Sequence, residues 1–390
     1  MKKLTKINTQ GFSHDILIML FVAIFAIAGV AHLVSSHADI PNPGPASSAT
    51  LVAANCSPTW VSGNQMVFNQ RGSNGLFNAY IGDINCQNAK TLLPATGGNV
   101  GASSVTPDGQ YVALEEAYGP QKTFSDSQPG KGVNNEIVLL DRNTGRITTL
   151  TTGGLGTIWA SLNSTATKIT WSQMVKTPLN SGSIKNYALG IWQIHAADIT
   201  PQGTLANEKV WSQPNDQGFY ETYGFYGNQI MFASDAGVYP KSSLGNWLSS
   251  QDWLIDSTLP SGSTAVRVSQ PLPNGFGGTS NDYHEFMSVA PSGTFSDSGP
   301  WFLTSIVYQA NGGMDLWRMK PDGSGLQRLT YFNGLQSRLS WQQVQGYPAP
   351  QYTIVANLAI DPNNPKVIYA NIIHSLSASQ IDCWKIQIAP

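Results

Sequence analysis

Residues Gly313–Thr330, "GMDLWRMKPDGSGLQRLT", predict two short β-strands joined by a tight turn. Pro321-Asp322-Gly323 supplies the turn, because proline presets φ and glycine accepts a positive φ. Leu316, Trp317 and Met319 place apolar side chains on both faces of the first strand. Such a strand is covered on both faces by neighbouring layers. The stretch is either a lone surface hairpin or one copy of a repeated unit.

The same order of strands and turns recurs six times along the chain, with loops of different length between the strands. The turn positions that align the units are Gly63, Gly109, Thr165, Gly227, Gly293 and Asn364. The units run from Ser57 to Pro94 and from Ser103 to Thr151, and the next four end at Ser212, Ser269, Thr330 and Pro390. Six units of four antiparallel strands without intervening helices predict an all-β fold, a six-bladed β-propeller, in which radial closure removes long exposed edges.

The N-terminal segment predicts a membrane helix in front of the propeller. Three lysines precede the apolar residues 16–34, a run long enough to cross a bilayer with the basic flank in the cytoplasm. The predicted organisation is a basic leader (1–15), a transmembrane helix or signal anchor (16–34), a Pro/Ser-rich linker (35–50) and the propeller (51–390). The propeller would then lie outside the cytoplasm, tethered to the cell membrane.

Processing of this segment has three possible outcomes. The helix is retained, or a signal peptidase cuts after Ala38, where "SHA" offers small residues. The third outcome comes from "KKLTKINTQGFSHDILIMLF", which resembles the leader of type IV pilin-like proteins. The resemblance implies cleavage after Gly11, although that family has a glutamate at the fifth mature position, where this chain has Ile16 after Asp15.

Composition excludes one class of partner. Charged residues make up 11% of the chain, the net charge is −2, and no run of Lys or Arg follows the N-terminus. Nucleic acid binding needs a basic surface, so no nucleic acid partner is expected.

Three stretches carry a family resemblance. "SPTWVSGNQMVF" (57–68), "TPDGQYVAL" (106–114) and "DLWRMKPDGSGLQRLT" (315–330) resemble the repeats of TolB-type propellers. The resemblance implies a propeller over residues 57 to 390. TolB has an α/β domain before its propeller and binds a peptidoglycan-associated lipoprotein, whereas here the linker runs directly into the first unit, so that role is not expected to carry over.

The sequence offers no enzyme signature. TolB-like propellers also accompany serine peptidases of the prolyl oligopeptidase kind, but the chain has no G-x-S-x-G motif and no room for a hydrolase domain. No H-E-x-x-H motif or zinc-type cysteine spacing occurs either. We therefore predict no enzymatic activity, no catalytic residues, no metal site and no cofactor.

Polar residues at the start of two inner strands are the candidate binding site. "FYETYGF" and "NDYHEF" hold equivalent places in the fourth and fifth units, where inner strands line the central channel. One interpretation is that they form a polar channel mouth that binds a ligand. The alternative is that they are ordinary polar residues of loops and the channel. The candidates are Tyr220, Glu221, Tyr223, Asp282, Tyr283, His284 and Glu285.

The three cysteines, Cys56, Cys86 and Cys383, suggest a disulfide in an exported chain. Cys56 precedes the first unit and Cys383 lies in the last, so a Cys56–Cys383 bond would latch the ring. A Cys56–Cys86 bond within the first unit and three free thiols are the alternatives.

Together these features predict a membrane-anchored binding module for a protein, peptide or glycan at the cell surface. A propeller enzyme acting on polysaccharide and a minor component of a pilus-like assembly are the alternative functions.

Overall fold

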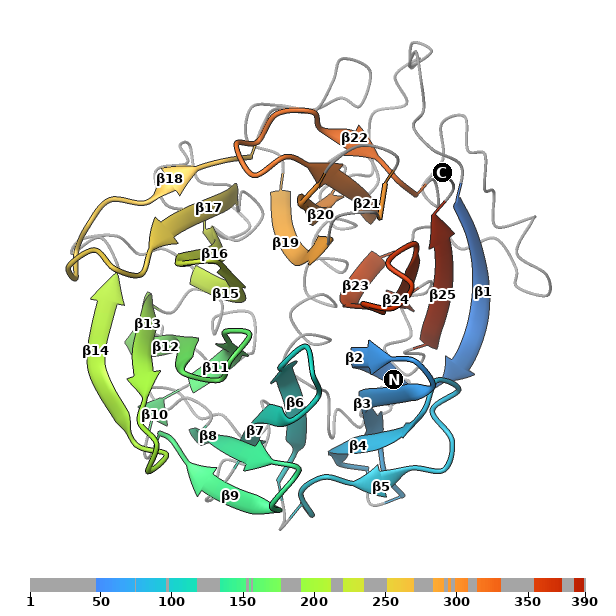
Figure 1. The fold of residues 1–390 in the computed structure, drawn as a ribbon, viewed down its shortest axis with the longest axis horizontal. Coiled ribbons are helices and arrows are strands. Elements are labelled where there is room, and N and C mark those ends of the chain that lie inside the picture. Colours follow the sequence, from blue (N-terminus) through green and yellow to red (C-terminus); the bar gives the residue numbers. More distant parts are fainter. Residues whose placement is uncertain are drawn as a thin grey trace, which may run out of the picture.

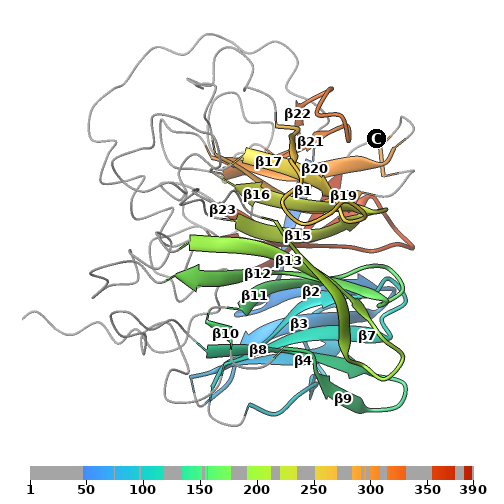
Figure 2. The ribbon, with the colours of Figure 1, turned by 90° about the vertical axis from the view of Figure 1, so that its left-hand side faces the viewer.

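The structure, a computed structural model, describes residues 47–73, 75–95, 98–117, 134–151, 154–155, 157–176, 191–211, 220–234, 251–269, 283–290, 294–295, 299–307, 314–330, 354–373 and 382–388. These residues form six antiparallel sheets arranged as blades around a central axis (Figure 1). Figure 2 shows the same ring from the side. The prediction of an all-β, six-bladed propeller is confirmed.

The predicted membrane helix (16–34) and the pilin-like leader lie outside the described residues. Within the ranges that are described, no helix is long and apolar enough to cross a membrane.

Each blade begins at the central axis with its first strand and ends at the rim. Blade one contains β2 (Ser57–Ser62), β3 (Gln65–Arg71), β4 (Phe77–Asp83) and β5 (Lys90–Thr91). Blade two contains β6 (Val100–Val105), β7 (Tyr111–Ala117), β8 (Asn134–Asp141), β9 (Arg146–Thr149) and β10 (Gly154–Leu155). Blade three contains β11 (Thr157–Leu162), β12 (Lys168–Lys176), β13 (Ile191–Ile199) and β14 (Leu205–Trp211).

The second half of the ring follows the same plan. Blade four contains β15 (Tyr220–Tyr226), β16 (Gln229–Ser234), β17 (Gln251–Asp256) and β18 (Val266–Arg267). Blade five contains β19 (Tyr283–Ala290), β20 (Trp301–Val307), β21 (Met314–Met319) and β22 (Gln327–Arg328). Blade six contains β23 (Ile354–Ile360), β24 (Val367–Ile373) and β25 (Asp382–Ile388), and its outer strand is β1 (Ser47–Ala54) from the other end of the chain.

Strand β1 closes the ring in a way that the sequence did not reveal. It pairs antiparallel with β25 from Ser47 opposite Ile388 to Ala54 opposite Asp382. The sixth unit supplies three strands, so β25 would otherwise present an open edge, which β1 covers. Because β1 begins at Ser47, the last four residues of the predicted linker (35–50) belong to this blade.

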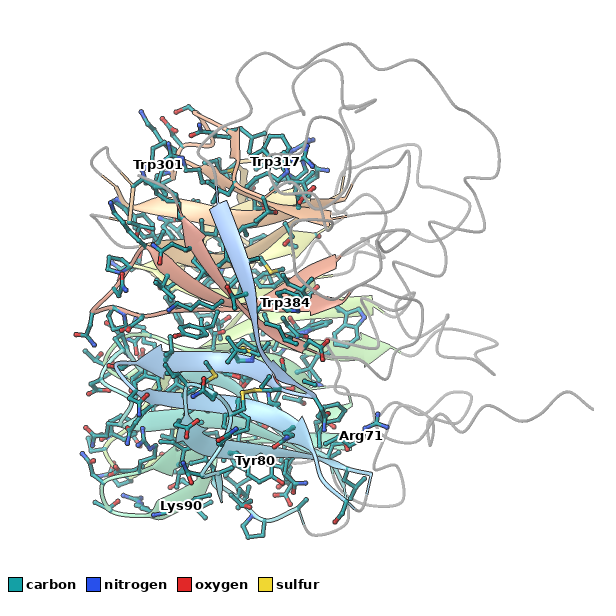
Figure 3. All side chains as sticks on the ribbon, turned by 90° about the vertical axis from the view of Figure 1, so that its right-hand side faces the viewer. Arg71, Tyr80, Lys90, Trp301, Trp317 and Trp384 are labelled. Atoms are coloured by element: carbon teal, nitrogen blue, oxygen red, sulfur yellow. A yellow bond between two sulfur atoms is a disulfide. The ribbon has the colours of Figure 1, made fainter. Side chains whose placement is uncertain are left out.

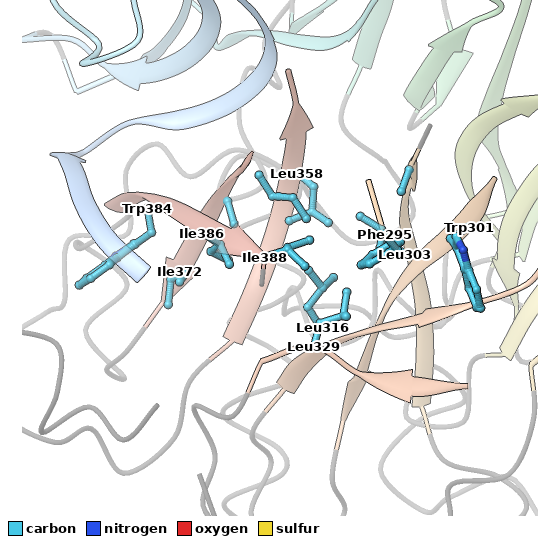
Figure 4. Close-up of a cluster of buried hydrophobic side chains, with 13 residues drawn as sticks. Phe295, Trp301, Leu303, Leu316, Leu329, Leu358, Ile372, Trp384, Ile386 and Ile388 are labelled. Atoms are coloured by element: carbon cyan, nitrogen blue, oxygen red, sulfur yellow. The ribbon is translucent and has the colours of Figure 1, made fainter. Parts of the chain in front are cut away.

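Apolar side chains fill the spaces between neighbouring blades. Leu316 belongs to the same buried cluster as Trp384 and Ile386 of blade six (Figure 4). Met319, three positions further along β21, packs with Met231 of blade four in another. The prediction that this strand is covered on both faces is confirmed.

The threonine of the "Leu-Thr" ending, Thr330, is hydrogen-bonded to the neighbouring strand of blade five. The Thr330 hydroxyl donates to Asp315 Oδ1 (2.7 Å) and accepts from the backbone amide of Leu316 (2.9 Å). Arg328 Nη2 lies 2.6 Å from Asp315 Oδ2, and both side chains are almost fully buried. The third and fourth strands of the blade are therefore joined by a buried ion pair and its hydrogen bonds.

Blade four repeats this junction with different side chains. Arg267 Nη2 donates to Gln251 Oε1 (2.6 Å), and the Ser269 hydroxyl donates to the same oxygen (2.7 Å). Gln251, Arg267 and Ser269 stand where blade five has Asp315, Arg328 and Thr330. The polar residues at the ends of these two repeats therefore join strands within a blade and do not form a ligand site.

Candidate functional site

All six inner strands contain a β-bulge at a similar height in the channel. In each inner strand, one or two residues have no partner in the backbone pairing with the second strand of the blade. Such β-bulges turn a side chain away from its regular direction. We call the following residues, one from each unpaired position, the bulge ring. Its members are Thr59, Ser103, Trp159, Tyr223, Met287 and Asn357.

The bulge ring surrounds a cavity on the propeller axis. The cavity has a volume of about 150 Å³, and every member of the bulge ring lines it. A cavity of roughly this size in another protein holds one benzene molecule. The space therefore suits a single side-chain-sized group.

Two members of the ring have an unusual backbone conformation. Trp159 has φ of 55° and Asn357 has φ of 43°, the left-handed region that few residues other than glycine adopt. Trp159 is held there by contacts on two sides. Its ring packs against Trp192 at 5.3 Å, and its carbonyl oxygen accepts from the Thr222 hydroxyl of the next blade. Such locally costly conformations often mark functional positions.

Polar side chains on the second strands hold the inner strands of the next blade near the bulges. Asn69 both donates to the Ala102 carbonyl (3.0 Å) and accepts from the Ala102 amide (2.7 Å). Glu115 Oε1 accepts from the Ala160 amide (3.0 Å), and the Ser172 hydroxyl accepts from the Thr222 amide (3.2 Å). Asn69, Glu115 and Ser172 are each the fifth residue of their strands. The repeat therefore builds a support for the bulge ring.

The described lining of the cavity is acidic. Glu115 and Glu221 line it, and no lysine, arginine or histidine is found among its described lining residues. The Glu221 side chain is nearly buried, with 3% of the residue exposed. Trp159 and Tyr223 add aromatic rings, whose faces attract cations. The chemistry of this lining favours a positively charged group.

The structure separates the predicted mouth residues. Glu221 and Tyr223 line the cavity together. Tyr220, Tyr283 and Glu285 lie on β15 and β19, but their side chains are outside the described part of the structure, as is the whole of Asp282.

His284 lies away from the cavity lining. It is 1% exposed, and its Nδ1 has no hydrogen-bond partner in the described part of the chain. Burial, and then the nearby charge of Arg267, lower the pKa of His284 to about 3. The imidazole is therefore neutral at physiological pH and belongs to the packing between blades four and five.

The lowered pKa of His284 predicts a loss of stability in acid. Below pH 6.5 the unfolded chain binds a proton at this position more readily than the folded chain, until the folded pKa of about 3 is reached. At 1.36 kcal/mol per pH unit, the cost at pH 5 is about 2 kcal/mol. Urea unfolding at pH 7 and pH 5 measures how far the free energy of unfolding falls in acid. This fall should be about 2 kcal/mol smaller for His284→Asn than for the unmodified chain. An equal loss in both proteins would contradict the neutral, buried His284.

The predicted Cys56–Cys383 latch is not the pair that the structure contains. Cys56 is bonded to Cys86, the alternative pairing, and Cys383 is a buried free thiol. The left-handed turn at Cys86 (φ 58°) follows β4 and brings its sulfur to Cys56, while Cys383 stands opposite Ala53 of β1. The ring is closed by backbone pairing instead.

Sequence reasoning found one member of the bulge ring, Tyr223, and missed the other five. The aligned repeats contained the signal, because each member lies a few positions before the turn that aligns its unit. No common residue type occurs there, so composition alone could not mark the position.

Comparisons with known proteins agree with the fold. No protein-family model matches the chain, and no curated protein matches its sequence. Similar solved structures include TolB from Acinetobacter baumannii, at 14% identity and a TM-score of 0.45, over 84% of this chain and 65% of that one. An auxiliary nutrient binding protein from Bacteroides thetaiotaomicron has 11% identity and a TM-score of 0.46, over 86% and 69%. The predicted TolB-like propeller is supported, and the chain spans just under two thirds of the TolB chain.

The prediction that the chain is not an enzyme requires correction. The propeller domain of the trilobed protease from Pyrococcus furiosus is also similar, at 11% identity and a TM-score of 0.45, over 82% of this chain and 79% of that one. Proteases are thus among the solved structures that this chain resembles, and the prediction of no enzymatic activity is withdrawn.

Proposed function

We propose that the protein is a binding module whose central cavity receives one positively charged group from a protein or peptide partner. A lysine side chain or a free amino terminus fits this description. The observation that carries the proposal is Glu221, a nearly buried carboxylate beside the bulge ring in a lining that includes a second carboxylate, Glu115. Charge-assisted hydrogen bonds to a carboxylate are stronger than neutral ones.

The size of the cavity favours a peptide over a glycan as the ligand. Pockets for whole small molecules usually measure 300 Å³ or more. At about 150 Å³, this cavity accepts the tip of one side chain, while the rest of a partner would lie across the face of the propeller. The aromatic rings of Trp159 and Tyr223 would offer their faces to the cation.

The proposal also keeps the predicted membrane anchor. Residues 16–34 would tether the module to the cell membrane, and the propeller would then meet partners outside the cytoplasm. This placement is supported by the apolar run and its basic flank.

A peptide array tests the proposal. Peptides with one free amine, either a lysine or the amino terminus, should bind the propeller, and acetylation of that amine should weaken binding tenfold or more. Glu221→Gln should have the same effect, because one charge-assisted hydrogen bond contributes about 1.5–3 kcal/mol. Mass spectrometry of the recovered peptides would show cleavage if the protein is a peptidase.

Asp322→Asn is the matched control, since it removes the same charge from an exposed turn of blade five. It should bind as the unmodified chain does. Equal binding of acetylated and free peptides would rule out the cationic ligand, and binding to a glycan array that is insensitive to Glu221→Gln would favour a glycan on another surface.

A further inference from the structure

All three cysteines of the chain meet at the junction between blades six and one. Their sulfur atoms lie within 4.8 Å of one another, and all three residues are buried. The surrounding cluster is apolar and includes Val61, Phe68 and Tyr369. Figure 3 shows this side of the molecule, with the Cys56–Cys86 disulfide as a yellow bond. A free thiol therefore stands next to a disulfide where the ring closes.

The backbone around the cysteines is held in place by both blades. Asn371 Nδ2 donates to the carbonyl oxygen of Cys56 (3.2 Å). On the neighbouring strand, Cys383 is the residue opposite Asn371. The sulfur of Cys86 lies 3.9 Å from the sulfur of Met66 in blade one. The three sulfurs are thus brought together by the regular pairing of the blades.

We propose that these residues form a thiol–disulfide exchange site that moves the covalent bond from blade one to the ring closure. The Cys383 thiolate attacks Cys56 Sγ, the Cys56–Cys383 bond forms, and the Cys56–Cys86 bond breaks. Cys86 leaves as a thiolate and takes up the proton that Cys383 released. One disulfide and one thiol are present before and after the exchange, so the step requires no oxidant or reductant.

The attack is directed to Cys56 because Cys86 is the better leaving group. Cys86 is 8% exposed, whereas Cys56 and Cys383 are both at 0%. A thiolate is stabilised by contact with water, and the rate of exchange rises with the stability of the departing thiolate. Attack on Cys86 would instead release a thiolate at the fully buried Cys56.

The exchange would change what closes the propeller. In the form that the structure shows, blade six is joined to the N-terminal strand by the pairing of β1 with β25. In the exchanged form, a covalent bond would join β25 directly to the residue before β2. The ring would then stay closed even when β1 separates from β25.

Native-state alkylation tests the exchange. Iodoacetamide added to the folded chain should trap the Cys86 thiol as it is released, and peptide mapping without reduction should show alkylated Cys86 with a Cys56–Cys383 disulfide. Burial raises the pKa of the Cys383 thiol to about 12, so the trapping rate should rise about tenfold per pH unit between pH 7 and pH 9. Alkylated Cys383 with an intact Cys56–Cys86 bond would overturn the proposal, as would a chain that reacts only when unfolded.

Two variants separate exchange from simple exposure. Cys383→Ala removes the attacking thiol and should leave Cys86 unalkylated. Cys86→Ala leaves Cys56 and Cys383, which should form a disulfide in the folded chain under mild oxidation with oxidised glutathione. Two free thiols in that folded variant after oxidation would also overturn the proposal.

Discussion

Removal of β1 is expected to destabilise the whole propeller, because this strand closes the ring. A chain that begins at residue 55 loses the backbone pairing of residues 47–54 with β25 and uncovers Trp384 and its neighbours. Leu51 and Val52, which pack against the clusters on either side of blade six, contribute about 3 kcal/mol by burial. The lost hydrogen bonds along the exposed edge add to this figure.

A chain that begins at residue 47 is the matched control, since it also lacks residues 1–46 but keeps β1. Urea unfolding of the two chains measures the difference. The shorter chain should unfold at a lower urea concentration and dimerise or aggregate through the open edge of β25. Equal stability of the two chains would show that β1 does not close the ring.

Asp315→Ala is expected to cost about 3–5 kcal/mol in the free energy of unfolding. The substitution leaves the Arg328 guanidinium, 4% exposed, without the carboxylate that lies 2.6 Å from it. It also removes the acceptor of the Thr330 hydroxyl. Breaking one side of a buried ion pair is more costly than removing the whole pair. Thermal or urea unfolding measures the loss.

Asp322→Asn, seven positions along the same hairpin, is the control. Asp322 accepts from the Ser324 amide in an exposed turn (2.9 Å), and its substitution should leave the free energy of unfolding nearly unchanged. Similar losses from the two substitutions would contradict the different roles that the structure gives these aspartates.

The fold could be predicted because its signals are local. Turn glycines mark the passage from the first to the second strand, and the structure gives positive φ to Gly63 (58°), Gly109 (74°) and Gly227 (60°). The predicted hairpin is confirmed over the described residues 314–330, with β21 and β22 on the two sides of the Asp-Gly turn. Each of these features depends on neighbours within a few residues.

The features that the sequence did not reveal depend on contacts between distant residues. "SSATLVAA" of β1 consists mostly of small residues with only two larger apolar side chains, Leu51 and Val52, and its partner strand lies at the other end of the chain. The choice between Cys86 and Cys383 as the partner of Cys56 depended on a turn and a ring closure that no local pattern indicates. His284 was predicted to be a mouth residue because it lies at the start of an inner strand, but its side chain is buried near Arg267 of blade four and does not line the cavity.

Two residues of the predicted channel mouth lie at the cavity, and their ligand-binding role stays a prediction. Glu221 and Tyr223 were identified from their place at the start of an inner strand, and both line the cavity. The bulge ring was missed because bulges depend on how each inner strand pairs with its neighbour. Trp159 in particular packs against Trp192 and also lines the cavity, a position that its residue type does not indicate.

A ligand-observed NMR titration of the propeller with n-butylammonium, set beside the neutral n-butanol, isolates the acidic cavity from the rest of the surface. The cation should bind the unmodified chain, and Glu221→Gln should raise its dissociation constant tenfold or more, while Asp322→Asn leaves it unchanged and n-butanol shows no difference among the three proteins. Equal affinity of the unmodified chain and Glu221→Gln for n-butylammonium would contradict a cation-binding cavity at the bulge ring.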